Sequence, residues 1–232
     1  MTDTFVPPTR FAVPGRIAVS NRAAATWQTA TLTEIRRETP GAVTFRFAVP
    51  EWTGHLPGQH LMLRLTADDG YVAQRHYSLA SPPDDTGHIE LTLDHVECGE
   101  VSGWFHTVAR PGDSVEVRGP LSGFFAWPGD RPALLVGAGS GVVPLMSMLR
   151  HHRARALDVP LRLLVSARGP EELIYAREYG AETTPVFTRT APEGMAVGRL
   201  AAAHLAPLLA ERPPGWVSDS VCGYKGLSEP AS

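Results

Sequence analysis

The pattern of apolar runs changes near Pro128-Gly129, and this change limits the possible folds more than any other feature. Before it, six short β-type runs recur, with turn dipeptides such as Pro40-Gly41 and Asp69-Gly70 between them. Within residues 89–94 apolar and polar residues alternate, which is typical of a half-buried antiparallel strand. Six such runs predict a closed barrel or a sandwich. The expected strands are residues 28–35, 43–47, 61–65, 71–78, 89–96 and 114–118, and a short helix is expected over 102–110 with Ser102 as its N-cap.

After residue 129, largely apolar strands alternate with helices, a pattern that predicts an α/β domain with a parallel sheet covered on both sides. We expect strands at 133–136, 161–165, 186–187 and 220–222, and helices at 144–156, 171–179 and 200–210. The chain is therefore expected to comprise a loose leader (1–25), a β-barrel domain (26–128) and an α/β domain (129–232).

Composition excludes several classes of function. The net charge of −3 and the pI near 6.3 provide no basic field for nucleic acid or an anionic membrane. Two cysteines, Cys98 and Cys222, are too few for a four-cysteine iron–sulfur or zinc site, and we expect no metal site. Cys98 is expected to be a small buried residue. There is no apolar run of ~20 residues and no secretory signal, so we expect a cytoplasmic protein without membrane contact.

The run from Tyr71 to Ser81 carries the first candidate site. If it is a strand, Arg75 and Tyr77 leave on one face and Ser78 on the other. A guanidinium can hold a diphosphate bidentately, a tyrosine ring can cover a flat aromatic cofactor, and a hydroxyl can bond a ring nitrogen. The alternative is an ordinary amphipathic strand with an exposed arginine.

The glycine-rich loop Gly137–Gly141 is the second candidate site. It follows an apolar strand and precedes a helix, where backbone N–H groups and the helix dipole can hold a diphosphate. Val142 stands where the third glycine of the dinucleotide fingerprint would be, so the loop is not that fingerprint. Pro144 suits the first helical turn. A plain strand-to-helix turn is an equal alternative.

The same loop allows a different class of enzyme. Ser140, Asp158 and His204 follow one another in the chain order of an α/β-hydrolase triad. Val142 is a poor fit for the small residue that such a serine needs two positions later. We therefore keep a hydrolase only as a minor alternative.

Taken together, the motifs resemble those of the ferredoxin–NADP reductase family, a family of flavin-dependent oxidoreductases. The segments that carry the resemblance are Pro57-Gly58-Gln59, Arg75-His76-Tyr77-Ser78, Gly99-Glu100-Val101-Ser102, Gly119-Pro120 with Gly123-Phe124, Gly137 to Pro144, and Cys222-Gly223. The resemblance runs from about Trp27 to the final residues. It implies a six-stranded antiparallel Greek-key barrel that binds FAD, followed by an α/β domain that binds NAD(P)H.

The resemblance also implies roles for individual residues. Tyr77 would stack on the isoalloxazine, Arg75 would bind the FAD diphosphate, and Ser78 would bond the reactive flavin nitrogen. Backbone N–H groups around Val101 and Ser102 would hold the same diphosphate, and Cys222 would border the nicotinamide. The expected catalytic residues are Ser78 and Cys222. The expected cofactor-binding residues are Arg75, His76, Tyr77, Ser78, Gly99, Val101, Ser102, Gly137, Gly139, Ser140, Gly141, Pro144, Ser166, Arg168, Arg189, Cys222 and Gly223.

The implied reaction is hydride transfer from NAD(P)H to FAD, followed by electron delivery to a separate acceptor such as a ferredoxin, or to a small acceptor. Arg168 and Arg189 could meet a 2′-phosphate and mildly favour NADPH, although they could equally be two surface arginines. We therefore expect NAD(P)H without choosing between the two nucleotides.

The end of the chain departs from the family pattern, because relatives continue past the Cys-Gly pair and this chain stops at Ser232. Pro230 also interrupts the helix expected there. We expect an α/β domain that is short at its C-terminus, with FAD still bound and nucleotide binding or stability reduced. A non-catalytic or degenerate flavin-binding subunit is therefore the second reading.

Overall fold

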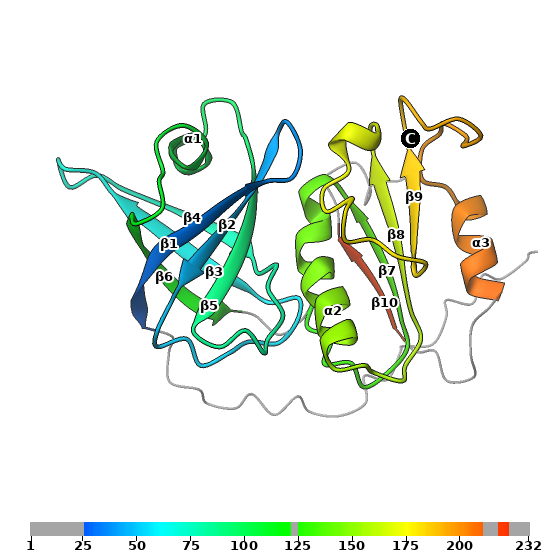
Figure 1. The fold of residues 1–232 in the computed structure, drawn as a ribbon, viewed down its shortest axis with the longest axis horizontal. Coiled ribbons are helices and arrows are strands. Elements are labelled where there is room, and N and C mark those ends of the chain that lie inside the picture. Colours follow the sequence, from blue (N-terminus) through cyan, green and yellow to red (C-terminus); the bar gives the residue numbers. More distant parts are fainter. Residues whose placement is uncertain (1–25, 122–124, 211–217, 223–232) are drawn as a thin grey trace, which may run out of the picture.

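The computed structural model describes residues 26–121, 125–210 and 218–222. Two sheets stand beside each other in Figure 1, an antiparallel sheet of six strands and a parallel sheet of four. Helix α2 (Val143–Ala154) lies between the two sheets, and α3 (Ala202–Ala210) covers the far face of the parallel one. The predicted leader (1–25), Gly123-Phe124 and Gly223 lie outside the described residues.

The antiparallel sheet has the strand order β4-β3-β6-β1-β2-β5. Its strands are β1 (Trp27–Arg37), β2 (Ala42–Ala48), β3 (His60–Thr66), β4 (Val72–Ser78), β5 (His88–Asp94) and β6 (Ser114–Leu121). Strand β6 is inserted between β3 and β1, and β5 returns beside β2, which gives the non-local order of a Greek key. The edge strands approach each other at one antiparallel bridge, Leu79–Leu91. The predicted six-stranded antiparallel fold is thus confirmed, but the barrel is not closed, because β4 and β5 meet only at this isolated bridge.

The interior of this barrel is aromatic and aliphatic. Phe45 and Phe47 from β2 pack against Phe105 of α1 (Glu100–Thr107), with ring centroids 4.9 and 6.0 Å apart. Helix α1 thereby closes one end of the barrel, and its first turn is held at a fixed place relative to β4 and β5.

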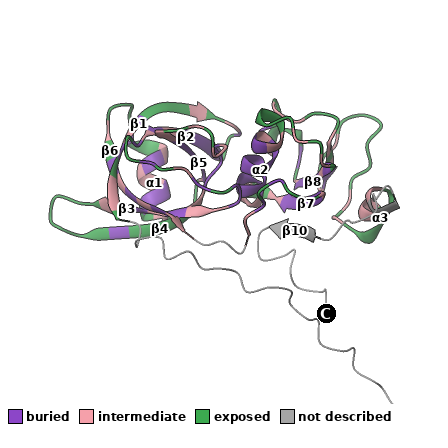
Figure 2. Ribbon diagram, turned by 90° about the horizontal axis from the view of Figure 1, so that it is seen from below, coloured by how far each residue is buried: buried purple, intermediate pink, exposed green. Residues whose placement is uncertain are grey.

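The parallel sheet has the strand order β10-β7-β8-β9. Its strands are β7 (Ala133–Ala138), β8 (Leu161–Ala167), β9 (Thr183–Phe187) and β10 (Ser218–Cys222). Because β8 and β10 lie on opposite sides of β7, the strand order reverses there, and the carboxyl ends of strands at such a point are where open α/β sheets bind ligands. Helix α2 is buried along most of its length, as its purple colour in Figure 2 shows.

The segment that leads from one sheet to the other is held against the barrel. The Trp127 N–H donates to the Pro57 carbonyl at 3.0 Å. Gly58 has φ +92°, and a Cβ there would collide with the Phe125 carbonyl and the Met148 side chain. Only glycine fits this junction, where the loop before β3 meets both the connecting segment and α2.

Several local predictions differ from the structure. Helix α1 begins at Glu100 with Gly99 as its N-cap, so the prediction of Ser102 as N-cap is wrong. The Ser102 Oγ instead accepts a hydrogen bond from the Val96 N–H at 3.4 Å and braces the preceding loop. Cys98 is exposed, not buried, and has φ +57°.

The predicted helix over 171–179 is also wrong. Only Pro170–Glu172 form a 3₁₀ turn, Leu173 is extended, and Tyr175 has φ +63°. The fully buried Tyr175 ring lies against the barrel, and that contact overrides the helical propensity of the segment. For the same reason β5 is buried on both faces, although its sequence alternates.

Within the part of the chain that the structure describes, no helix has both the length and the apolar character needed to cross a bilayer.

Candidate functional site

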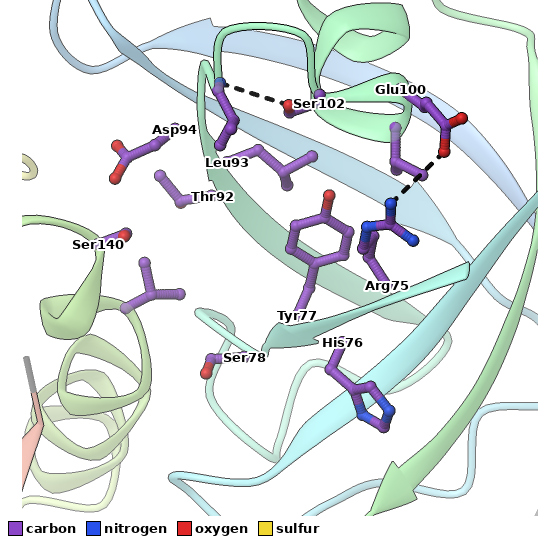
Figure 3. A pocket seen from close by; sticks show the side chains of 14 residues that line it. Arg75, His76, Tyr77, Ser78, Thr92, Leu93, Asp94, Glu100, Ser102 and Ser140 are labelled. Atoms are coloured by element: carbon purple, nitrogen blue, oxygen red, sulfur yellow. Dashed lines mark hydrogen bonds and ion pairs between the residues drawn. The ribbon is translucent and has the colours of Figure 1, made fainter. Parts of the chain in front are cut away.

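A pocket of about 350 Å³ opens where the two halves of the molecule meet (Figure 3). The barrel contributes β4 residues 75–78, β5 residues 92–94 and the start of α1, residues 99–102. The other half contributes Ser140 and Val143. The two candidate sites found in the sequence are therefore brought to one cavity.

Strand β4 divides its side chains as the alternation predicts. Arg75 and the Tyr77 ring face the pocket, and His76 points away from them (Figure 3). The His76 ring lies beside His60, with ring centroids 5.1 Å apart. Ser78 is half-buried at the end of β4, on the side of the pocket nearest Ser140.

Tyr77 presents a flat ring that is half-buried against the barrel core. Burial raises the pKa of its phenol to about 12, so the ring stays neutral throughout the physiological range. A neutral aromatic face on a rigid strand suits stacking with a planar heterocycle.

The start of α1 forms the opposite wall of the pocket. Gly99 caps the helix without a side-chain hydrogen bond, and a Cβ at Gly99 would collide with the Ser102 Oγ. Val101 and Ser102 are buried, so the first turn is fixed in place. Its backbone N–H groups can receive an anion at the positive end of the helix dipole.

Charge at the pocket comes from Arg75 and Glu100. The Arg75 Nη2 lies 3.4 Å from the Glu100 Oε2, and the Tyr71 hydroxyl donates to the Glu100 Oε1 at 2.8 Å. The sequence reasoning missed Glu100 as a site residue. Its position directly after the cap glycine was the available signal, because a first-turn side chain lies beside whatever the helix terminus binds.

The glycine-rich loop forms a 3₁₀ turn, η1 (Gly139–Val142), that leads into α2. A Cβ at Gly137 would lie 2.8 Å from the Leu145 Cδ1, so glycine allows the turn to pack on β7. Gly139 is exposed with φ +52° and has no heavy atom near its Cβ position. Gly141 continues this turn, and Pro144 occupies the first helical turn, as predicted.

The remaining predicted residues gather along the carboxyl edge of the parallel sheet. Ser166 pairs in register with Ala138, and Cys222 pairs with Gly137. The Arg189 N–H donates to the Arg168 carbonyl at 2.9 Å, so the chains that leave β8 and β9 run side by side. The Arg168 side chain lies 3.5 Å from the Glu172 carboxylate. None of these residues lines the pocket.

The hydrolase alternative finds no support in the geometry. Asp158 precedes β8 and lies at the opposite edge of the sheet from Ser140. His204 lies on α3, where its Nδ1 accepts a hydrogen bond from the Ala201 N–H at 3.0 Å. Helices α2 and α3 cover opposite faces of the sheet, so the three side chains do not converge.

The pocket fits a flavin dinucleotide. It combines a flat neutral ring, a guanidinium and an open helix terminus in one groove. The ring suits an isoalloxazine, and the guanidinium and the helix terminus suit a diphosphate.

In a comparison with known families, residues 29–126 match the family described as the oxidoreductase FAD-binding domain. Among curated proteins, the chain is 36% identical over 124 residues to the glycine betaine monooxygenase reductase subunit of Chromohalobacter salexigens, covering 53% of this chain and 33% of that protein. It is 38% identical over 125 residues to ferredoxin–NADP reductase B of Sorangium cellulosum, covering 53% and 50%. The chain thus spans between one third and one half of the length of these relatives.

Among solved structures, the fold is similar to a ferredoxin NADP⁺ reductase from Neisseria gonorrhoeae that holds FAD and NADP. The TM-score is 0.72 at 24% sequence identity, and the match covers 87% of each chain. The fold is also similar to phthalate dioxygenase reductase, with a TM-score of 0.67 at 20% identity over 87% of this chain and 61% of that one. Because both sequence identities are below 25%, these similarities concern the fold alone.

Proposed function

We propose that this chain is a ferredoxin reductase-like FAD-binding oxidoreductase, which oxidises NAD(P)H through FAD and passes the electrons to a separate acceptor. The acceptor is a ferredoxin or similar protein, or a small molecule. The observation that carries this proposal is the shared pocket, where Arg75, Tyr77 and the start of α1 face Ser140 from the other half.

The proposal includes a division of labour between two domains. Residues 26–128 bind FAD and residues 129–232 bind NAD(P)H. The support is that the antiparallel sheet carries the whole aromatic and cationic wall of the pocket, whereas the glycine-rich turn belongs to the parallel sheet.

FAD supplies a ring that takes up a hydride and releases electrons one or two at a time. The residues of the chain bind and orient it. Tyr77 covers the ring, Arg75 and the N–H groups near Val101 and Ser102 hold the diphosphate, and the Ser78 hydroxyl bonds the reactive ring nitrogen. Gly99 leaves room for Ser102 and Val96, so the helix terminus can pack in the position where it receives the diphosphate.

The carboxyl edge of the parallel sheet holds the pyridine nucleotide. The turn at Gly139 to Gly141 receives its diphosphate, and Ser166 with the adjacent Arg168 and Arg189 receives its adenosine end. Cys222, in register with Gly137, borders the nicotinamide. Holding two rings in contact in a pocket shielded from water is the main contribution of the protein to such a transfer.

The proposal also covers the preferred nucleotide and the cellular setting. Arg168 and Arg189, whose backbones are hydrogen-bonded where the chain leaves β8 and β9, mildly favour NADPH over NADH, because guanidinium groups at this end of the sheet suit a 2′-phosphate. A cytoplasmic setting is consistent with only two cysteines, of which Cys98 is a free and exposed thiol.

The proposed class of electron acceptor is inferred from the related proteins. Several are reductase components, such as the electron transfer component of toluate 1,2-dioxygenase and the ferredoxin reductase component of 3-ketosteroid-9-alpha-monooxygenase. We therefore propose a separate oxygenase or ferredoxin-type protein as the acceptor.

A visible absorption spectrum, recorded without oxygen before and after NADPH or NADH is added, tests the function. A flavin band that bleaches supports the reductase, and the faster nucleotide is the preferred one. A band that persists with both nucleotides indicates the non-catalytic flavin-binding subunit. A chain that takes up no FAD contradicts the proposal.

A further inference from the structure

Glu100 occupies an unusual place in the pocket. It is the first residue of α1, and its carboxylate accepts a hydrogen bond from the Tyr71 hydroxyl at 2.8 Å. The same carboxylate lies 3.4 Å from the Arg75 guanidinium (Figure 3). Tyr71 directly precedes β4 and Arg75 lies within it, so one continuous segment of the barrel holds this carboxylate, which lines the pocket, at two points.

The Glu100 carboxylate competes with a phosphate group for the Arg75 guanidinium. Arg75 provides the guanidinium of the pocket, and the first turn of α1 provides its N–H donors. Glu100 belongs to that same first turn, its carboxylate contacts the Arg75 guanidinium, and it carries the same sign of charge as a diphosphate. A phosphate that approaches Arg75 must therefore displace Glu100 or bind beside it.

Stability alone gives a weak reason for this arrangement. The side chains of Arg75 and Glu100 are 55% and 49% exposed, and an ion pair so exposed adds little to folding. A carboxylate in a first helical turn does interact favourably with the helix dipole, but that interaction needs neither Tyr71 nor Arg75.

We infer that Glu100 is a built-in anionic competitor that weakens the hold of this chain on the phosphate groups of its flavin. The inference rests on the proposed flavin site and concerns the affinity of that site. It gives a cofactor that exchanges with free flavin more readily than Arg75 and the helix terminus alone would allow. Glu100 acts on the phosphates and leaves the ring contact with Tyr77 unchanged.

The test measures flavin dissociation constants with the full chain depleted of flavin, by titration with FAD and, separately, with riboflavin, which has no phosphate. Glu100→Gln keeps the side-chain shape and removes the charge. We expect it to tighten FAD about tenfold at low salt, to lose most of that gain at high salt, and to leave riboflavin unchanged. Glu100→Ala should shift FAD in the same direction.

Glu97→Gln is the matched control, because Glu97 is an exposed carboxylate three residues earlier that does not line the pocket. It should change neither constant. FAD affinity that is unchanged or weaker in Glu100→Gln overturns the inference and leaves the flavin site standing. An equal gain for riboflavin also overturns it, because the effect would then not act through phosphate. If neither wild type nor variant binds FAD, both the inference and the proposed function fail.

Discussion

The two halves of the molecule meet in two regions, which differ in how far an arginine is buried and how fully it is paired. At the pocket, Arg75 is more than half exposed and faces one carboxylate at 3.4 Å. Behind the pocket, at the seam between α2 and β5, the Arg150 side chain is only 14% exposed. It donates to the Ala80 carbonyl at 2.9 Å and to Glu90 at 2.8 Å, and grips Glu178 through two nitrogens. The same residue type thus fixes the seam and leaves the pocket open to a ligand.

The seam extends beyond Arg150. The Tyr175 hydroxyl lies 2.5 Å from the Thr92 Oγ1, and the Ser147 hydroxyl donates to the Ser81 carbonyl at 2.7 Å. Thr92 also lines the pocket, so the seam directly supports one pocket wall. A buried, paired contact behind an exposed pocket is a suitable arrangement for holding two rings at a set distance while cofactors enter and leave.

Removing the Arg150 cation from the seam should have the largest effect, and this effect should be on stability. Arg150→Met leaves Glu90 and Glu178 without their shared partner, and we expect a loss of about 3–5 kcal/mol in the free energy of unfolding. Urea unfolding measures it. Arg155→Met, which removes an exposed ion pair with Asp84, is the control and should change the stability little. Equal effects of the two variants would remove the distinction between a fixed seam and an exposed surface.

A substitution on the pocket side should change ligand affinity and leave most of the stability intact. Tyr77→Leu keeps an apolar contact with the barrel core and loses the aromatic face. We expect FAD affinity to fall roughly three- to tenfold, the range that aromatic pairing provides. Fluorescence titration gives the affinity, and urea unfolding should show a smaller loss than for Arg150→Met. Unchanged FAD affinity would mean that the ring does not stack.

The Tyr175 hydroxyl should make a smaller contribution. Tyr175→Phe removes its hydrogen bond to Thr92, but Thr92 keeps the Thr44 hydroxyl at 2.7 Å as a partner. We expect a cost of about 1 kcal/mol in unfolding free energy. If the bond accounts for this cost, Tyr175→Phe should cost less in a Thr92→Val background than in the wild type. Full additivity of the two changes would argue against a direct contact.

The smallest expected effect is a difference in acid sensitivity. Burial raises the pKa of Glu90, but Arg150 and Arg36 outweigh burial, so the net shift is downward. Ionised Glu90 therefore contributes stability at neutral pH, and this contribution is lost as the pH falls through its folded-state pKa. Below about pH 4.5, the wild type should lose stability more steeply than Glu90→Gln. Parallel pH profiles would show that Glu90 is not held by charge.

Much of the barrel and of the flavin wall could be predicted from the sequence, because both depend on local patterns. Alternation placed β5, and spacing placed Arg75 and Tyr77 on one face. The failures depend on contacts between distant segments. Tyr175 leaves helical geometry to reach Thr92, and Glu100 enters the site through Tyr71. The partners in both contacts lie far apart in the chain, so neither contact could be predicted locally, although the position of Glu100 after the cap glycine did mark it as a first-turn residue.

The glycine junction at Gly58 has a consequence for how proteins of this architecture can be recombined. A connecting segment that swung freely would let any nucleotide module be joined to any barrel by splicing at residue 128. Here the loop before β3, the segment at Phe125 and Met148 of α2 share one tight spot. A chimera that swaps the second half must therefore carry a matching Pro57-Gly58 loop. The true unit of exchange is larger than the boundary in the sequence suggests.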